Sequence, residues 1–240
     1  MPDEGRLKER SRCSAHCATD PWHFPALPYL TFERSAALYH TLKYVLEANV
    51  SGHIAECGAY KGDTARGIAT YLRDKAPWKL LHVFEGFLGI PQLREEDDRV
   101  GLLGKMLGWD NWKVVCIEPA GLDVTIGAYR ATQEEFWQTI GNVSGYIQLH
   151  AGWFHDTMPL FKEPLCAVHI DCDVYSSTVL ALGYCAPIVL PGGVMVIDDD
   201  QSEWAGVTRA VDVFLAEYAS EWDVDRDDRR RSCILWKRGE

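Results

Sequence analysis

Two groups of carboxylates follow apolar segments in the second half of this 240-residue chain. Asp171 and Asp173 follow the apolar run 165–170, and Asp198, Asp199 and Asp200 follow the run 194–197. In an open parallel sheet, the carboxyl ends of the strands meet at the crevice where ligands bind. So much negative charge is costly unless a cation lies among the groups, and a hard divalent ion suits oxygen ligands. The pattern predicts a metal site; the alternative is ordinary solvated strand ends and helix caps.

A second site is predicted where a glycine turn joins a strand to a helix. Residues 53–57 form a short apolar strand, and residues 58–62 form a glycine turn that leads into a helix capped by Asp63 or Thr64. Glycines let the backbone approach a ligand closely, and the start of a helix offers free N–H groups. The next strand, residues 80–84, ends at Glu85, an acid placed to accept hydrogen bonds from both ribose hydroxyls.

The glycine turn lacks the spacing that binds a dinucleotide pyrophosphate. Glu56-Cys-Gly58-Ala-Tyr-Lys-Gly62 does not match G-x-G-x-x-G, which disfavours a nicotinamide-dependent oxidoreductase without excluding it. An acid before a looser turn better suits a ligand that carries an amine and no phosphate. S-adenosylmethionine is such a ligand. A later turn, 152–159, places Trp153 or Phe154 either beside an adenine or in the core.

The remaining segments alternate between strand and helix patterns. Residues 1–28 are predicted to be an N-terminal arm, and residues 29–240 one domain with an irregular insertion at about 86–123. Helices are expected at 31–49, at 131–140 and around 207–218, a strand at 146–150, and a final hairpin whose turn holds Arg229 to Arg231. This order predicts a Rossmann-like α/β fold with a mostly parallel seven-stranded sheet, a C-terminal antiparallel hairpin and helices on both faces.

Composition narrows the class of partner and the compartment. The formal net charge of −11 argues against nonspecific nucleic-acid binding, and no apolar run approaches the length of a membrane span. Eight irregularly spaced cysteines without a signal peptide ahead of them indicate a reducing, cytoplasmic setting. Cys13, His16 and Cys17 lie close together, but no second pair stands at zinc-site spacing.

From about Pro28 to Lys237, the chain resembles the macrocin O-methyltransferase family of class I, S-adenosylmethionine-dependent enzymes. The most specific motifs are Asp171-Cys-Asp173 with Tyr175, Ser177 and Thr178, and Gly192-Gly193 through Asp198-Asp199. Ala55-Glu-Cys-Gly58 with Lys61-Gly62, and Gly152-Trp-Phe with Asp156-Thr157, are also similar to family patterns. Departures are Glu85 where aspartate is usual, Asp63 in place of a second glycine, and His155 in place of a basic residue.

The resemblance implies roles for individual residues. Asp171 is expected to be the catalytic base, and Asp171, Asp198 and Asp199 are expected to hold Mg²⁺ or a similar ion. The cofactor is expected to contact Glu56, Gly58, Tyr60, Lys61, Gly62, Thr64, Glu85, Gly152, Trp153 and Asp171. Apart from the resemblance, the acceptor is expected to contact Tyr29, Trp109, Trp112 and His155, because these residues are expected to cover the sheet edge that carries the acids. The alternative is that both tryptophans pack the insertion onto the domain. A homodimer is a further expectation of the resemblance.

These observations predict methyl transfer from S-adenosylmethionine to a hydroxyl of a small molecule, such as a sugar, polyol or natural-product intermediate. Coordination to a divalent ion acidifies a hydroxyl, which makes an aspartate with an ordinary pKa near 3.9 a plausible base. Two neighbouring hydroxyls would chelate the ion best, which favours a vicinal diol or catechol-like acceptor. The alternative from another class is a non-catalytic partner that keeps the fold, against which the joint retention of the acids argues.

Overall fold

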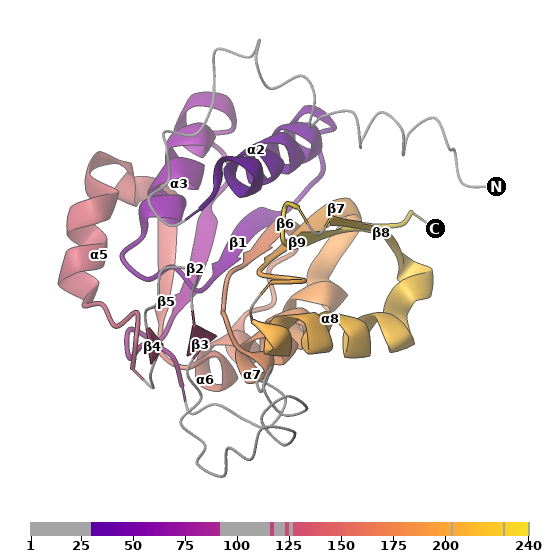
Figure 1. Cartoon of the computed structure of the whole chain (residues 1–240). Coiled ribbons are helices and arrows are strands. Elements are labelled where there is room, and N and C mark those ends of the chain that lie inside the picture. Colours follow the sequence, from indigo (N-terminus) through magenta and orange to yellow (C-terminus); the bar gives the residue numbers. More distant parts are fainter. Residues whose placement is uncertain are drawn as a thin grey trace.

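The computed structural model describes residues 30–91, 127–202, 204–227 and 229–239, together with the backbone of 116–117 and 123–124. Its main sheet has seven strands in the order β5-β2-β1-β6-β7-β9-β8 (Figure 1). These strands are β1 (His53–Cys57), β2 (Leu81–Glu85), β5 (Ile147–Ala151), β6 (Leu165–Ile170), β7 (Val189–Asp198), β8 (Trp222–Asp227) and β9 (Ser232–Lys237). All neighbours pair in parallel except β9, which runs antiparallel to β7 and β8. A separate antiparallel pair, β3 (Cys116–Ile117) and β4 (Asp123–Val124), lies in the expected insertion.

Helices cover both faces of the sheet and form a three-layer molecule (Figure 1). On one face are α2 (Phe32–Glu47), α3 (Asp63–Lys75) and α5 (Gln133–Ile140); on the other are α6 (Phe154–Thr157), α7 (Tyr175–Cys185) and α8 (Ala205–Tyr218). Four short 3-10 segments complete the described part: η4 (Gly141–Tyr146), η5 (Met158–Leu160), η6 (Ala186–Ile188) and η7 (Ala219–Glu221).

Successive side chains of each central strand enter different cores. In β1, Ile54 packs with α2 and α3, whereas Ala55 and Cys57 pack with α7 and α8. Alternate side chains of a strand point to opposite faces, so a strand covered on both sides reads as a continuous apolar run. This burial makes the single polar residues within the central strands, such as Glu56 and His169, exceptional.

The sequence-based prediction of the fold class is confirmed, including the parallel strands and the closing hairpin. One detail is wrong: α3 begins at Asp63 with Gly62 as its N-cap, and neither Asp63 nor Thr64 caps it. Gly62 has φ 87, and a Cβ there would overlap the Phe136 ring, so only glycine fits this start. The expected arm 1–28, Tyr29, Trp109, Trp112 and most of the insertion lie outside the described residues. None of the helices in the described ranges is long and apolar enough to cross a bilayer.

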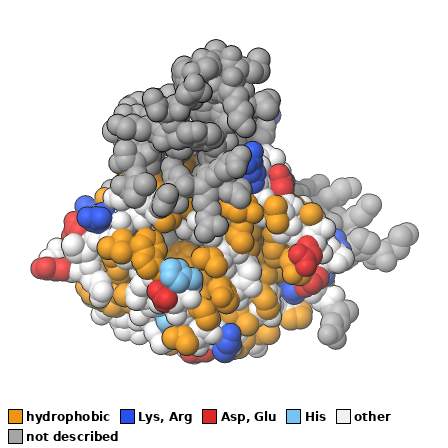
Figure 2. Space-filling model, turned by 90° about the horizontal axis from the view of Figure 1, so that it is seen from below, with side chains coloured by type: hydrophobic (Ala, Val, Ile, Leu, Met, Phe, Trp, Pro, Cys, Tyr) orange, Lys and Arg blue, Asp and Glu red, His pale blue; other side chains and the backbone are white. Residues whose placement is uncertain are grey.

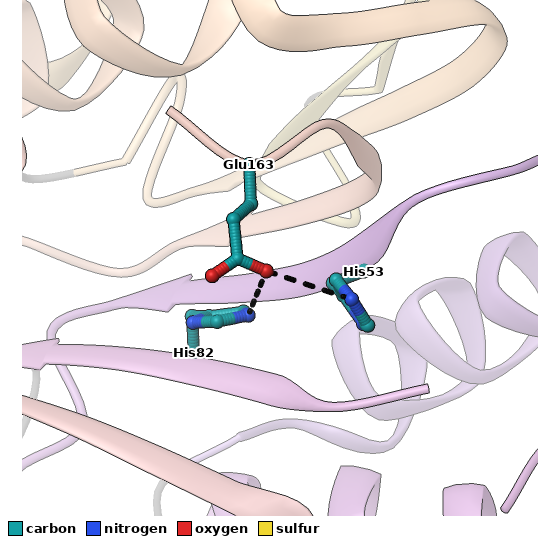
Figure 3. A group of neighbouring side chains, drawn as sticks. All are labelled: His53, His82 and Glu163. Carbon is teal, nitrogen blue, oxygen red and sulfur yellow. Dashed lines mark ion pairs between the residues drawn. The ribbon is translucent and has the colours of Figure 1, made fainter. Parts of the chain in front are cut away.

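Three histidines and a glutamate gather at the amino edge of the sheet. Nε2 of His53 and Nε2 of His82 both face Oε2 of Glu163, at 3.6 and 3.7 Å (Figure 3). Nδ1 of His53 accepts a hydrogen bond from the backbone N–H of Leu80, so the neutral ring carries its hydrogen on Nε2. Both distances to Glu163 are too long for a hydrogen bond, and Nε2 of His82 is buried without a hydrogen-bond partner among the described residues. The cluster also includes His150, whose Nε2 lies 3.1 Å from Nδ1 of His82.

The buried His82 should make the stability of the fold depend on pH. Burial lowers its pKa to about 4, with further lowering by His150 and His53. The unfolded chain, with an ordinary histidine pKa near 6.5, therefore binds the proton first, and stability falls as pH drops from 6.5 toward 4. We expect about 2 kcal/mol of the unfolding free energy to be lost between pH 7 and pH 5 through this group.

Urea titrations at several pH values will measure this loss. In His82→Leu the pH dependence should be flatter, whereas His155→Gln, which changes an exposed histidine, should leave it as in the wild type. Equal slopes for the wild type and His82→Leu would show that His82 does not titrate as described.

Candidate functional site

The crevice lies where the strand order reverses between β1 and β6. Gly58 follows β1 and Asp171 follows β6, and the two backbones are in direct contact: N–H of Asp171 donates to the carbonyl of Cys57 at 2.9 Å. Gly58 has φ 85, and a Cβ there would overlap the carbonyl oxygen of Asp171. Glycine is therefore required for the two strand ends to meet at this point. The meeting brings together the two predicted sites.

One cavity of about 1050 Å³ opens at this edge. A volume at the upper end of the usual range for small-molecule pockets has room for a cofactor and an acceptor together. Most residues predicted for the site line it: Glu56, Gly58, Tyr60, Lys61, Thr64, Glu85, Trp153, His155, Asp171 and Asp199. Gly62, Gly152 and Asp198 lie behind the lining and shape it instead.

Glu85 holds the glycine turn in place. Its Oε2 accepts hydrogen bonds from the backbone N–H groups of Ala59 and Tyr60, at 2.7 and 2.8 Å. Its Oε1 accepts a further bond from Phe87 N–H at 2.7 Å. A carboxylate has about four lone-pair positions, so three amides leave about one for a ligand hydroxyl. Glu85 therefore has room to accept one hydrogen bond from a ribose hydroxyl, whereas the sequence predicted two. Its other role is to hold the turn.

Removing this carboxylate should weaken cofactor binding more than one lost ligand contact would. Glu85→Ala leaves three backbone donors without a partner, at about 1–3 kcal/mol for each buried group. We expect the affinity for S-adenosylhomocysteine to fall by a factor of 10 to 100 in calorimetry. Glu85→Gln keeps one acceptor oxygen and should lose less. Wild-type affinity in Glu85→Ala would place the cofactor away from this turn.

The three predicted metal ligands lie around Asp171, but not as one set. Ligand atoms of Asp171 and Asp198 come together with His169, and those of Asp171 and Asp199 come together with Asp173, each set within 4.8 Å. Asp199 also accepts a 2.6 Å hydrogen bond from Nη2 of Arg34. Asp171 is therefore the residue shared by both sets.

His169 joins two site carboxylates beneath the cavity. Its Nδ1 lies 3.2 Å from Oε1 of Glu56, and its Nε2 lies 3.1 Å from Oδ2 of Asp198. The register of the sheet creates this contact, because β1 pairs Glu56 with His169 of β6. Burial alone would lower the pKa of His169, but the bonds to Asp198 and Glu56 outweigh it and raise the pKa well above its ordinary value. The ring therefore links two buried carboxyl groups, one through each nitrogen.

Carboxyl groups outnumber basic side chains in this group. Glu56, Asp171, Asp198 and Asp199 lie around Arg34 and His169. Burial and the charges of Asp198 and Asp199 raise the pKa of Asp171 to about 8. Oδ1 of Asp198 is buried and has no hydrogen-bond partner among the described residues. An excess of carboxyl groups, one of them with a buried and unsatisfied oxygen, fits the chemistry of a divalent cation.

Several of the site residues were missed by sequence analysis as members of the site. Arg34 comes from the first turn of α2, and Arg229, Arg230 and Arg231 line the cavity from the turn between β8 and β9. His169 stands two residues before Asp171 on a buried strand, a signal that could have been used because such residues share a face. Asp200, expected near the metal, instead forms a two-bond ion pair with Arg226, at 2.6 and 2.7 Å. His155 lines the cavity with its ring largely exposed.

The wall of the cavity contains unusual backbone conformations. Eight residues other than glycine have positive φ in the described part of the chain. Five of them line the cavity: Tyr60, Tyr129, Asp173, Asp199 and Arg231. For residues with a Cβ this conformation costs roughly 1–2 kcal/mol each. The surroundings of the cavity therefore hold its side chains in directions that a relaxed chain would not choose.

Comparison with known sequences places the chain among methyltransferases. The sequence profile described as Macrocin-O-methyltransferase (TylF) matches residues 8–238. Mycinamicin III 3''-O-methyltransferase of Micromonospora griseorubida is 28% identical over 168 residues, which are 68% of this chain and 60% of that protein. Demethyldecarbamoylnovobiocin O-methyltransferase of Streptomyces niveus is 26% identical over 228 residues, 90% of this chain and 78% of that protein. The chain spans 60% and 64% of the length of the first two curated relatives it matches.

Solved structures agree on the fold. The O-methyltransferase NovP superposes with a TM-score of 0.66 at 22% identity, covering 99% of both chains. CalS11, a calicheamicin methyltransferase, superposes with a TM-score of 0.61 at 17% identity, covering 100% of this chain and 95% of that one. The class I methyltransferase architecture predicted from the sequence is therefore confirmed.

Proposed function

The chain belongs to the macrocin O-methyltransferase family, and from this membership we propose that it transfers a methyl group from S-adenosylmethionine to a hydroxyl of a small natural product. The observation that carries the proposal is the meeting of two sites in one cavity. The glycine turn fixed by Glu85 and the acid group around Asp171 line the same space. We place both sites in one domain over residues 29–240.

The side chains around the cavity suit an in-line displacement. A methyl sulfonium is intrinsically reactive, so the protein must align acceptor oxygen, methyl carbon and sulfur and remove the hydroxyl proton. Asp171 is the proposed base, because it lines the cavity at the end of β6, where the two sites meet. Arg34 and His169 fix the neighbouring carboxylates. A divalent ion held by Asp171, Asp198 and Asp199 would lower the pKa of the acceptor hydroxyl.

We propose a vicinal diol, as on a sugar, as the acceptor. Two neighbouring hydroxyls offer two oxygens to one divalent ion, which an isolated hydroxyl does not. One relative, from Streptomyces olivaceus, is named as a 4'-O-methyltransferase of a 2,3-dimethoxy-rhamnosyl tetracenomycin, which supports a sugar hydroxyl but offers a methoxy oxygen, not a second hydroxyl, beside it. His155, which lines the cavity, and the unplaced Tyr29, Trp109 and Trp112 remain the proposed acceptor contacts.

Thermal unfolding with two ligands tests the proposed chemistry. S-adenosylhomocysteine at 100 times its dissociation constant should stabilise the protein by about 2.7 kcal/mol, whereas NADH should not. The opposite result would support a nicotinamide-dependent oxidoreductase. Tritium transfer from labelled S-adenosylmethionine to a panel of glycosylated acceptors then separates an enzyme from a non-catalytic partner with this fold.

A homodimer in a reducing, cytoplasmic compartment, without nucleic-acid or membrane partners, completes the proposal. Hydrophobic side chains are spread over the face seen in Figure 2, with scattered charged groups between them. Large apolar side chains exposed on the helices of one layer include Val179 and Tyr184 of α7 and Val213 of α8. Such surfaces are common at subunit interfaces. The described cysteines are all free thiols, which suits a reducing compartment.

A further inference from the structure

The turn between β8 and β9 reaches the cavity because of the sheet topology. β7 ends at Asp198, and its antiparallel neighbour β9 begins opposite it, with Asp198 paired to Ser232. The residues just before Ser232 must therefore lie at the same edge as the site carboxylates. Three consecutive arginines occupy this place, and Arg229, Arg230 and Arg231 all line the cavity.

Hydrogen bonds to Asp227 hold residues 229–231 of this turn. Oδ1 of Asp227 accepts hydrogen bonds from the backbone N–H groups of Arg229 and Arg230, at 2.9 and 3.3 Å. The carbonyl of Asp227 accepts a 2.8 Å bond from Arg231 N–H, and Arg231 has φ 54. The side chain of Arg230 is itself anchored, with Nε donating to Ser232 Oγ at 2.7 Å. The backbone of Arg229, Arg230 and Arg231 is thus held in place at the edge of the cavity.

Arginines in this position are unexpected in so acidic a protein. The chain has 24 lysines and arginines against 35 aspartates and glutamates. Several cations of the cavity are engaged by acids: Arg34 by Asp199 at 2.6 Å, Lys61 by Glu135 at 3.2 Å and Arg230 by Asp225 at 3.3 Å. Among the described residues, no acid pairs with the side chain of Arg229. The turn therefore places arginine side chains at one end of a cavity that is otherwise rich in acids.

We propose that Arg229 and Arg231 bind an anionic group, a phosphate or a carboxylate, carried by the acceptor. A guanidinium matches both groups with two parallel N–H donors. The inference rests on the proposed function, because it assigns the acceptor rather than the cofactor to this end of the cavity. β9 lies two strand spacings from β6, about 10 Å, and three from β1, about 14 Å. The anion is therefore remote from the cofactor turn and separated from the reacting hydroxyl by the length of a small molecule.

Binding of simple anions tests this assignment before the acceptor is known. Calorimetry is carried out on the full chain saturated with S-adenosylhomocysteine, in chelator, with inorganic pyrophosphate in one arm and citrate in the other. At least one probe should bind the wild type, and the double variant R229Q/R231Q should bind it at least tenfold more weakly. The preferred probe distinguishes a phosphate from a carboxylate. R238Q, at the opposite end of the same hairpin, is the matched control and should bind as the wild type.

Three results would overturn the assignment. They are binding of neither probe by the wild type, equal binding by wild type and double variant, and a matching loss in R238Q. A tenfold loss of S-adenosylhomocysteine affinity in the double variant would instead assign the arginines to the cofactor and also refute the proposal. If the wild type fails to bind S-adenosylhomocysteine, the proposed function fails, and the anion titrations on the unliganded chain still report on the arginines.

Discussion

Replacing Asp171 by asparagine should nearly abolish methyl transfer and yet make the metal-free protein more stable. Loss of a positioned general base lowers rates by about 10²–10⁴-fold. The gain in stability follows from the raised pKa of Asp171, about 8, which burial and the charges of Asp198 and Asp199 produce. A carboxyl with a raised pKa favours the folded state while protonated, and this contribution is lost as pH rises from about 3.9 to 8. At pH 8 the asparagine variant should be more stable by about 3 kcal/mol, allowing for partial solvent exposure.

Two measurements separate these effects. Single-turnover assays report the rate, and urea unfolding in chelator at pH 8 and pH 5.5 reports stability, whose difference between variant and wild type should shrink at the lower pH. Asp156→Asn, which changes an exposed acid close to the site, should alter neither. A variant with wild-type turnover would show that another group takes the proton. A variant without any gain in stability at pH 8 would show that Asp171 is not repelled by its neighbours.

Removal of divalent metal should reduce turnover at least 100-fold while S-adenosylhomocysteine affinity changes less than threefold. The carboxyl groups around Asp171 outnumber the basic side chains among them, and Oδ1 of Asp198 is unsatisfied among the described residues. A Lewis acid stabilises developing charge by several kcal/mol, which corresponds to this loss of rate. The cofactor turn is fixed by Glu85 and does not depend on these carboxylates.

Dialysis against chelator, followed by addition of Mg²⁺, is the direct measurement. Turnover should return with Mg²⁺ in the wild type and remain low in Asp198→Asn. His82→Leu should keep the metal dependence of the wild type, because the cluster of His82 and Glu163 is remote from the cavity. Full turnover after exhaustive chelation would contradict the metal site, and Arg34 would then be the cation that balances Asp199.

The sequence predicted those site residues whose position depends only on where a single strand ends. Asp171 and Asp198 were assigned to one place because parallel strands carry their carboxyl ends to one edge. The bond of His169 to Glu56 could not be derived in this way, since it depends on which strands are neighbours and on their register. The arginine turn was recognised as a hairpin, but its position at the cavity depends on β9 running antiparallel to β7.

Glu85 shows a second kind of contact that sequence patterns do not predict. An acid after the second strand predicted a ligand contact, and the acid does line the cavity. Its three bonds to backbone N–H groups depend on the path of the turn and of residue 87, which composition does not specify. Pattern analysis finds the residue type that a ligand would need. It does not show how many of that residue's lone pairs the protein already uses.

The left-handed residues around the cavity have a consequence for engineering this protein against heat. Each of the five is a position where glycine would relieve backbone strain, so redesign for thermostability would select these sites early. They include Asp199, a proposed metal ligand, and Arg231, a proposed anion contact. At these positions the fold gives up some stability, and the side chains line the cavity. A heat-resistant variant is therefore better sought on the outer faces of α3 and α8, where changes leave this geometry intact.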